Sequence, residues 1–319
     1  MERPVKVACA QVEPAVFDRE ATLDKLEKVA AEAAGNGAEL VVFPETFLPV
    51  YPSSAWAKAF AGWQDPRAKE TFARLAQQSV AVDSPAESRI AAAAQELGIW
   101  IVTGVNEVDA ERPGTIYNAL FYHSPAGELA LHHRKLVPTN HERLVWGQGD
   151  GRGLSAVETG FGRLGGLICW ENYMPLARVA LYESGVEIYV ASTADDGDAW
   201  QATLVHIARE SRAYVVAPAH FQREDAYPDD FPLAAEIEGA GTIGRGGSAI
   251  LAPDGSYLAG PLYDEEGILY AELDPAQLLA ERQRFDPVGH YSRPDVLQLS
   301  VRAPDATPST RPSGQSSRS

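Results

Sequence analysis

Cys169 is the residue of this sequence best suited to chemistry, because it ends the apolar stretch 164–169 and directly precedes polar residues. We predict that this stretch is a strand and that a helix begins at Met174-Pro175. The thiol then lies at a strand-to-helix turn, where the positive end of the helix dipole favours an anion. We therefore expect a lowered pKa for the thiol and a role as nucleophile, provided that a base and a cation lie beside it.

Three further charged residues occupy comparable positions in the sequence. Glu45 follows the apolar run 38–43, which we predict to be a strand. Lys135 ends the predicted strand 129–135, and Glu142 follows after a short loop. Because open α/β sheets place their ligand sites outside the carboxyl ends of strands, these side chains and the thiol are candidates for one site.

Each of these residues also has an ordinary structural interpretation. A cysteine at a strand end often packs as a small hydrophobic residue, and a lone lysine or glutamate is often solvated. Glu142 could instead form an ion pair with Arg134 or Arg143. No spacing rule brings the four residues together, so residue types alone leave these alternatives open. Cys9, inside the predicted strand 5–12, has no charged neighbour placed to activate it and is expected to be a core residue.

Strands and helices alternate along most of the chain, with two tight turns between strands. The predicted strands are 5–12, 38–43, 99–104, 117–122, 129–135, 164–169, 186–192, 214–217, 248–252, 257–259 and 268–273. The predicted helices are one that ends at Gly35, a region over 66–97 interrupted at 83–85, and those over 175–184, 200–211 and 275–284. Alternation combined with hairpins predicts an α/β protein whose sheets contain both parallel and antiparallel pairs.

The chain reads as one domain followed by a short tail. Its 319 residues are 45% hydrophobic and 22% charged, which suits a globular domain, and no linker-like composition occurs before residue 302. Residues 303–319 consist mostly of Pro, Ser, Thr and Gly, so they cannot bury enough apolar surface to offset the entropy of ordering. We therefore predict one domain over 1–302 and a disordered tail over 303–319.

Charge and cysteine usage limit the partners and the compartment. The net charge of −17 disfavours nucleic acid and anionic membranes as partners. Two cysteines imply no disulfide framework, and no apolar run approaches the roughly 18 residues that a membrane span needs. We predict a cytoplasmic protein with no nucleic acid and no membrane partner.

Three stretches in the expected order resemble the signature blocks of the nitrilase superfamily. They are 43–47 (FPETF), 133–143 (HRKLVPTNHER) and 169–176 (CWENYMPL). The stretches around Asp195-Asp196 and 290–297 (HYSRPDVL) resemble further parts of true nitrilases, so the resemblance covers residues 5 to about 300. The triplet Cys-Trp-Glu at 169–171 is similar to the nitrile-hydrolysing branch rather than to the amidase branches.

This resemblance implies an αββα sandwich of two mixed β-sheets with outer helices, and a site that needs no cofactor and no metal. Cys169 would be the nucleophile, Glu45 the general base and acid, and Lys135 the electrostatic stabiliser. Glu142 would position Lys135 and the attacking group. The implied reaction converts an organic nitrile and two waters into a carboxylic acid and ammonia, through a thioimidate and then a thioester on the cysteine. A weakly electrophilic nitrile carbon suits a thiolate, and burial of Glu45 would raise its pKa toward neutrality.

The same resemblance suggests residues that contact the nitrile substrate and an assembly of several copies. Tyr51, Thr139, Trp146 and Trp170 are the candidate substrate-binding residues. The backbone N–H of Trp170 would be a second donor to the negative charge that develops on attack. Relatives form dimers through their helix layers and often extend into spirals, so we expect a homodimer or a larger spiral homo-oligomer.

Two other functions stay open at this point. An amidase or carbamoylase of the same superfamily would use the same four residues on an amide carbon. A non-catalytic or redox-sensing protein would use Cys169 only as a reactive thiol.

Three other patterns favour structural roles. The dinucleotide-like pattern GFGRLG at 160–165 precedes a strand rather than a helix, so we interpret it as a turn. Asp198 is expected to cap the helix that begins at Trp200 rather than to bind a metal. His132 and His133 are neighbours in a strand and face opposite sides, which argues against joint ligation of one ion.

Overall fold

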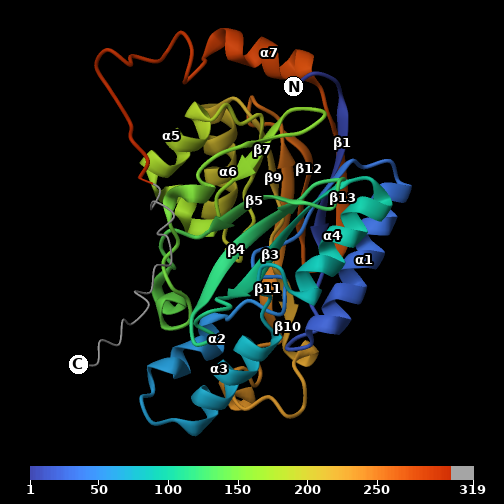
Figure 1. Cartoon of the computed structure of the whole chain (residues 1–319), viewed down its shortest axis with the longest axis vertical. Helices are drawn as coiled ribbons and strands as arrows, with labels where there is room; N and C mark the ends of the chain where they lie inside the picture. The colour runs from blue at the N-terminus through green and yellow to red at the C-terminus, as the bar shows by residue number, and fades with distance from the viewer. Residues whose placement is uncertain (303–319) are drawn as a thin grey trace, which may run out of the picture.

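The computed structural model of the protein describes residues 1–302, so the predicted disordered tail 303–319 lies outside the described residues. Two mixed β-sheets form the centre and helices flank them (Figure 1). The strands are β1 (Val5–Gln11), β2 (Leu40–Val42), β3 (Trp100–Val108), β4 (Ile116–His123), β5 (Leu129–Arg134), β6 (Val157–Glu158), β7 (Arg163–Gly166), β8 (Ile188–Val190), β9 (Tyr214–Ala217), β10 (Phe221–Arg223), β11 (Thr242–Leu251), β12 (Tyr257–Tyr263) and β13 (Gly267–Leu273). The helices are α1 (Arg19–Gly35), α2 (Ser54–Ala57), α3 (Pro66–Gln78), α4 (Pro85–Leu97), α5 (Pro175–Glu183), α6 (Asp198–Ser211) and α7 (Pro275–Arg284).

Each sheet has a parallel centre and antiparallel edges. The first sheet has the order β13-β1-β2-β3-β4-β5, and β1, β2 and β3 run parallel. The second has the order β10-β11-β9-β8-β7-β6, with β12 paired to β11, and β7, β8 and β9 run parallel. The predicted mixture of parallel and antiparallel pairs is confirmed.

The two sheets pack face to face, and helices cover their outer faces. Successive strand residues point to opposite faces, so Val41 of β2 packs against α1 and α4, whereas Leu40 and Val42 pack between the sheets. On the outer face of the second sheet, Tyr189 packs with Leu204 of α6 and with α5 residues. Figure 1 shows α1 and α4 on one flank and α5 and α6 on the other. The predicted αββα sandwich is confirmed.

Local capping residues set the helix boundaries. Asp18 accepts the Ala21 N–H at the start of α1, and Ser84 accepts the Glu87 N–H at the start of α4. The predicted interruption of the helical region at 83–85 is therefore confirmed. The predicted cap at Asp198 is wrong: the Trp200 N–H bonds to the carbonyl of Gly197, so Asp198 is already the first helical residue.

The strand predicted to end at Cys169 ends earlier. β7 stops at Gly166, and Cys169 has a left-handed backbone (φ 51°) that begins the 3₁₀ helix Cys169–Tyr173. The Cys169 N–H still bonds to the Ser192 carbonyl at 2.9 Å, so the turn stays against the end of β8. A Cβ at Gly166 would lie 2.0 Å from the Val190 oxygen, so only glycine permits this close strand approach.

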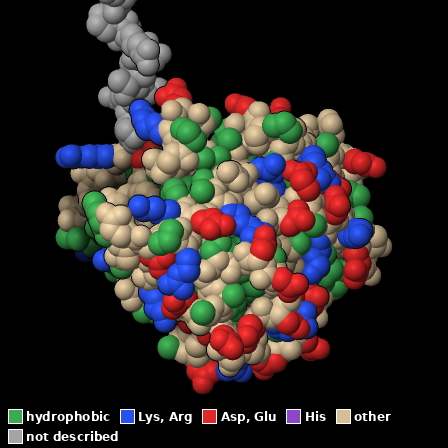
Figure 2. Space-filling model, turned by 90° about the horizontal axis from the view of Figure 1, so that it is seen from below, with side chains coloured by type: hydrophobic (Ala, Val, Ile, Leu, Met, Phe, Trp, Pro, Cys, Tyr) green, Lys and Arg blue, Asp and Glu red, His purple; other side chains and the backbone are tan. Residues whose placement is uncertain are grey.

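The described part of the chain contains no helix that is both long and apolar enough to cross a membrane. On the face shown in Figure 2, acidic and basic side chains are interspersed with apolar ones.

Candidate active site

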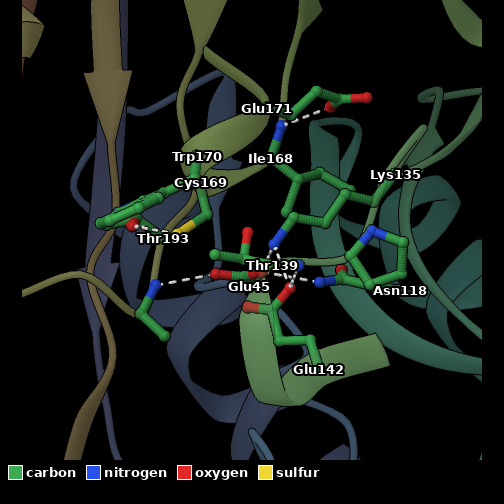
Figure 3. Close-up of polar contacts among 12 residues, drawn as sticks. Glu45, Asn118, Lys135, Thr139, Glu142, Ile168, Cys169, Trp170, Glu171 and Thr193 are labelled. Carbon is green, nitrogen blue, oxygen red and sulfur yellow. Dashed lines mark hydrogen bonds and ion pairs between the residues drawn. The ribbon is translucent and has the colours of Figure 1, made fainter. Parts of the chain in front are cut away.

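Four chain segments bring the predicted catalytic residues to one place. Glu45 follows β2, Lys135 follows β5, Glu142 lies in the 3₁₀ helix Asn140–Leu144, and Cys169 begins the 3₁₀ helix after β7. Figure 3 shows their side chains directed toward a common centre. The sandwich therefore assembles residues that are separated by up to 124 positions in the sequence.

Lys135 holds the two glutamates together. Its Nζ donates to Glu45 Oε1 at 2.9 Å and to Glu142 Oε2 at 2.7 Å, and all three side chains are buried. The alternative ion pairs of Glu142 with arginine do not form, because Arg134 pairs with Glu107 and Arg143 donates to the Pro138 carbonyl. The site thus contains one buried ammonium between two carboxylates (Figure 3).

The Glu45 carboxylate accepts two more hydrogen bonds. Asn118 Nδ2 donates to Oε1 at 2.6 Å, and the Ala194 N–H donates to Oε2 at 2.8 Å. Burial raises the pKa of Glu45 above its ordinary value, although Lys135 and Asn118 oppose the rise. The predicted direction of this pKa shift is confirmed, and the group is a stronger base than an exposed glutamate.

Glu142 is fixed by donors on both of its oxygens. The Tyr51 hydroxyl donates to Oε1 at 2.8 Å, and the Thr139 N–H donates to Oε2 at 2.6 Å. Oε2 also accepts from Lys135, so Glu142 cannot turn away without breaking several bonds. Burial works to lower the pKa of Lys135, but Glu45, Cys169 and Glu142 outweigh it and raise the pKa. Lys135 is therefore an ammonium.

The Cys169 thiol differs from the prediction in its acidity. Burial raises the pKa of Cys169, and the charge of Glu45 raises it further, whereas Lys135 and the Thr193 hydroxyl oppose the rise. The predicted lowering by a helix N-terminus is wrong, because desolvation and the nearby carboxylates outweigh the short 3₁₀ helix. The Thr193 hydroxyl donates to the sulfur at 3.1 Å. The resting thiol is protonated and needs a base.

Three non-glycine residues with left-handed backbones adjoin the site. They are Thr46 (φ 42°), Asn140 (φ 42°) and Cys169 (φ 51°). Such conformations are costly for residues with a Cβ, and they persist where the surrounding contacts fix them. A Cβ at Gly104 would lie 2.1 Å from the Pro44 oxygen, so glycine is required for β3 to pass beneath the turn that carries Glu45.

Glu171 connects the cysteine turn to the lysine strand, a role that the sequence analysis missed. Glu171 Oε2 forms hydrogen bonds with the Ile168 N–H and with His133 Nε2, each at 2.9 Å. Glu171 Oε1 accepts a hydrogen bond from the Leu136 N–H at 2.8 Å. Ile168 precedes Cys169 and Leu136 follows Lys135. The buried carboxylate therefore joins the backbones that present the nucleophile and the cation.

Other contacts of the site were also missed. Asn118 and the Ala194 N–H hold Glu45, and Thr193 holds Cys169. The motif around Asp195-Asp196 was a signal for the segment that contains Thr193 and Ala194. Asn118 lies in the middle of β4 and carries no such signal, because its proximity to Glu45 depends on the sheet.

A cavity of about 390 Å³ adjoins the thiol. Of the four candidate substrate-binding residues, Tyr51, Thr139 and Trp170 line it together with Cys169. Trp146 lies outside this lining: it is buried, its ring centroid is 5.9 Å from that of Tyr51, and its Nε1 donates to Asn106. Trp170 is half exposed, and its Nε1 donates to Asp195 at 2.6 Å.

No group of three or more potential metal ligands is found among residues 1–302. His132 and His133 contact Glu107 and Glu171 respectively, so their predicted opposite orientation is confirmed.

Cys9 is fully buried in the core, as predicted. Residues 160–162 of the pattern at 160–165 lie in the turn between β6 and β7, as predicted, and residues 163–165 belong to β7.

Comparison with known proteins identifies the family. The model of the carbon-nitrogen hydrolase family matches residues 6–283. An aliphatic nitrilase from Sinorhizobium fredii is 41% identical over 296 residues, which cover 93% of this chain and 95% of the relative. An arylacetonitrilase from Trametes versicolor is 39% identical over 323 residues, covering 97% of this chain and all of the relative.

A solved structure shares the fold. The carbon-nitrogen hydrolase from Helicobacter pylori G27 has a TM-score of 0.71 at 20% identity, covering 92% of this chain and 97% of that one. The chain belongs to the carbon-nitrogen hydrolase family, which confirms the superfamily that its motifs predicted.

Proposed function

We propose that the protein is a nitrilase, which hydrolyses an organic nitrile to the carboxylic acid and ammonia. The observation that carries the proposal is the buried Lys135 ammonium, bound by Glu45 and Glu142 beside the Cys169 thiol. The similarity to nitrilases over more than nine-tenths of the chain supports a nitrile rather than an amide as the substrate.

In the first half of the reaction, Glu45 accepts the thiol proton as the sulfur attacks the nitrile carbon. A C–S bond forms, one π bond of the C≡N group breaks, and the electron pair moves to nitrogen. The Glu45 carboxyl then returns the proton to that nitrogen, which gives a neutral thioimidate. Lys135 and the Trp170 N–H would stabilise the negative charge that develops on nitrogen.

In the second half, water replaces nitrogen and then sulfur. Glu45 takes a proton from a water as it adds to the thioimidate carbon and delivers it to the nitrogen, which gives a tetrahedral intermediate with one hydroxyl and one amino group. Glu45 then transfers the hydroxyl proton to the amino nitrogen as the C–N bond breaks, so that ammonia leaves and a thioester remains. A second water attacks the thioester in the same way, which releases the carboxylic acid and restores the thiol. Glu142 acts by positioning Lys135 and the attacking group, since its two oxygens are held by Tyr51 and Thr139.

Three of the four candidate substrate-binding residues have a place beside the substrate in this proposal. Tyr51, Thr139 and Trp170 border the cavity and would contact the bound nitrile. Trp146 would act one layer behind, by supporting the ring of Tyr51.

Ammonia release from a panel of nitriles and matched amides, with acid and amide products separated, tests the proposal. Cys169→Ala should abolish ammonia release while the protein stays folded, whereas Cys9→Ala should retain turnover because Cys9 lies in strand β1 within the core. Normal turnover by Cys169→Ala would overturn the mechanism. Faster hydrolysis of amides than of matched nitriles would assign the protein to the amidases or carbamoylases instead.

We also propose that the protein works in the cytoplasm as a homodimer or a larger spiral homo-oligomer. The two cysteines are unpaired, as in a reducing compartment. Apolar side chains stand exposed on the outer surface, among them Leu176 of α5 at 68% and Leu297 in the irregular segment after α7 at 75%. A second copy of the chain would cover such surface.

A further inference from the structure

The wall of the cavity contains two polar side chains with no role in the proposed reaction. His220 directly precedes β10 and Gln222 lies within it, and both line the cavity that contains Cys169. They are two residues apart in extended chain and therefore face the same side. Their exposed fractions are 4% for His220 and 2% for Gln222, so both are built into the wall.

Each of these side chains has an unpaired polar atom. Within residues 1–302, His220 Nε2 and Gln222 Oε1 are buried and have no hydrogen-bond partner. The Gln222 Nε2 makes only a long contact of 3.4 Å with the Arg223 carbonyl. Buried polar groups are normally satisfied, so two unpaired atoms in the wall of one cavity are available to a partner that a bound molecule supplies. The terminal torsions of histidine and glutamine allow two-fold rotation, which can turn these atoms toward the cavity.

The acidic side chains of the cavity already have partners. Asp195 accepts from the Trp170 Nε1 and the Gly197 N–H, and Asp196 accepts the Arg245 N–H. Glu142 is bound by Lys135, Tyr51 and Thr139, as described above. His220 and Gln222 are thus distinct from the groups that build the catalytic centre.

Charge further restricts what can bind there. The lining includes Asp195 and Asp196, which form no ion pair among the described residues, and it includes no lysine or arginine; its third acidic residue, Glu142, is paired with the buried Lys135. Burial lowers the pKa of His220 to about 4, so its imidazole is neutral near pH 7. The cavity therefore repels an anionic substituent and accepts a neutral or cationic one.

Building on the proposed nitrilase activity, we propose that His220 and Gln222 form a subsite for a hydrogen-bond donor on the substrate. The preferred substrates are nitriles whose side chain carries a hydroxyl or ammonium group. Either group donates to Gln222 Oε1, and a hydroxyl can also exchange a hydrogen bond with the His220 imidazole. A hydrocarbon side chain would leave both wall groups unpaired, and a carboxylate would face the acidic lining without a proton to donate.

A matched set of 3-substituted propionitriles tests the preference. The substituents are methyl, hydroxyl, ammonium and carboxylate on the same two-carbon spacer, and the readout is kcat/KM for ammonia release at pH 7. We expect the hydroxyl or the ammonium compound to exceed the methyl compound by about tenfold or more, with the carboxylate lowest. Comparing kcat/KM between the hydroxyl and ammonium compounds identifies which donor group the subsite binds better.

Variants of His220 and Gln222 test whether these two residues cause the substrate preference. Gln222→Met and His220→Phe remove the polar atoms and keep comparable bulk, and each should reduce the ratio of donor to methyl substrate toward one. Ser54→Ala is the control, because Ser54 lines the same cavity with an exposed hydroxyl and should leave the ratio unchanged. If a variant does not fold, the substrate ratio of the unaltered protein still decides the question.

The outcomes separate this inference from the function on which it rests. Hydrolysis of the methyl compound at least as fast as that of both donor compounds would overturn the subsite while leaving the nitrilase intact. A donor preference that survives both wall variants would also overturn it. Absence of ammonia release from every nitrile would instead reject the proposed function.

Discussion

At the residue scale, burial in the same site adjusts the acidity of both Glu45 and Cys169. Burial raises the pKa of both groups, so the thiol keeps its proton and the carboxylate gains basicity. Three donors, from Lys135, Asn118 and Ala194, hold the carboxylate as an acceptor. The proton can therefore pass from sulfur to carboxylate when a substrate draws electron density from the sulfur.

The pH dependence of kcat/KM should report the raised pKa of Glu45. The base acts only when deprotonated, so activity should fall as pH drops through a midpoint above 4.5, the ordinary value for glutamate. Asn118→Leu removes a donor that lowers this pKa, and should move the midpoint to higher pH. Ser54→Ala, at an exposed position of the cavity, is the control and should not move it. A profile that stays flat down to pH 4.5 would contradict the assignment of Glu45 as base.

At the scale of elements, the site depends on the register between the end of β5 and the turn after β7. Glu171 fixes this register by accepting the backbone N–H groups of Leu136 and Ile168 together with His133. Burial acts to raise the pKa of Glu171, but His133 and these N–H groups outweigh it and lower the pKa. The carboxylate is thus charged, and both of its oxygens are committed to positioning Lys135 and Cys169.

Glu171→Gln should impair both stability and catalysis. An amide has one accepting oxygen, so its NH2 group would face a backbone N–H that is left unpaired in the core. We expect a loss of about 2 kcal/mol in unfolding free energy. Catalysis should fall through kcat more than through KM, because the nucleophile and the cation lose their alignment.

Denaturant unfolding and steady-state kinetics on the same samples check this prediction. Glu183→Gln, which changes an exposed glutamate of α5, is the matched control and should alter neither quantity. Unchanged kcat at saturating nitrile in a folded Glu171→Gln protein would refute the positioning role.

At the scale of the whole molecule, apolar side chains remain exposed on the outer helix layer and on the irregular segment after α7. Tyr173, just before α5, is 45% exposed and Leu176 in its first turn is 68% exposed, while Val296 and Leu297 are 64% and 75% exposed. Figure 1 shows the chain after α7 crossing to the flank where α5 lies. Exposed apolar surface of this kind is typical of a face that contacts another subunit.

Leu176→Glu should therefore reduce the mass of the assembly in solution. A charge placed in an apolar contact between subunits is desolvated without a partner, which weakens association. Light scattering coupled to size exclusion measures the mass. Lys69→Glu is the control, since Lys69 is an exposed polar residue of α3 and should leave the mass unchanged. A single-chain mass for the unaltered protein would reject the proposed oligomer.

Much of the fold was predictable because its signals are local. The alternation of apolar residues located most strands and helices, and the errors lay in their boundaries. For example, β2 has three residues, Leu40–Val42, whereas the predicted strand was 38–43. The order of strands in each sheet could not be read from periodicity, because it depends on which segments pair over long range. Asp198 was misassigned as a cap for a related reason. The capping residue is the one whose carbonyl accepts the first hydrogen bond of the helix, and here that residue is Gly197. Side-chain preference alone does not identify it.

By itself, the sequence determined the types and order of the four candidate catalytic residues and the family to which the chain belongs. The tertiary structure decided their environment: it raised the pKa of Cys169 where the local turn predicted a lower one, since desolvation depends on everything packed around the thiol. It also put Trp146 behind the cavity and joined Glu171 to the backbones beside Lys135 and Cys169. These properties arise from contacts between residues far apart in the chain, whereas a pattern of neighbouring residues records only local geometry.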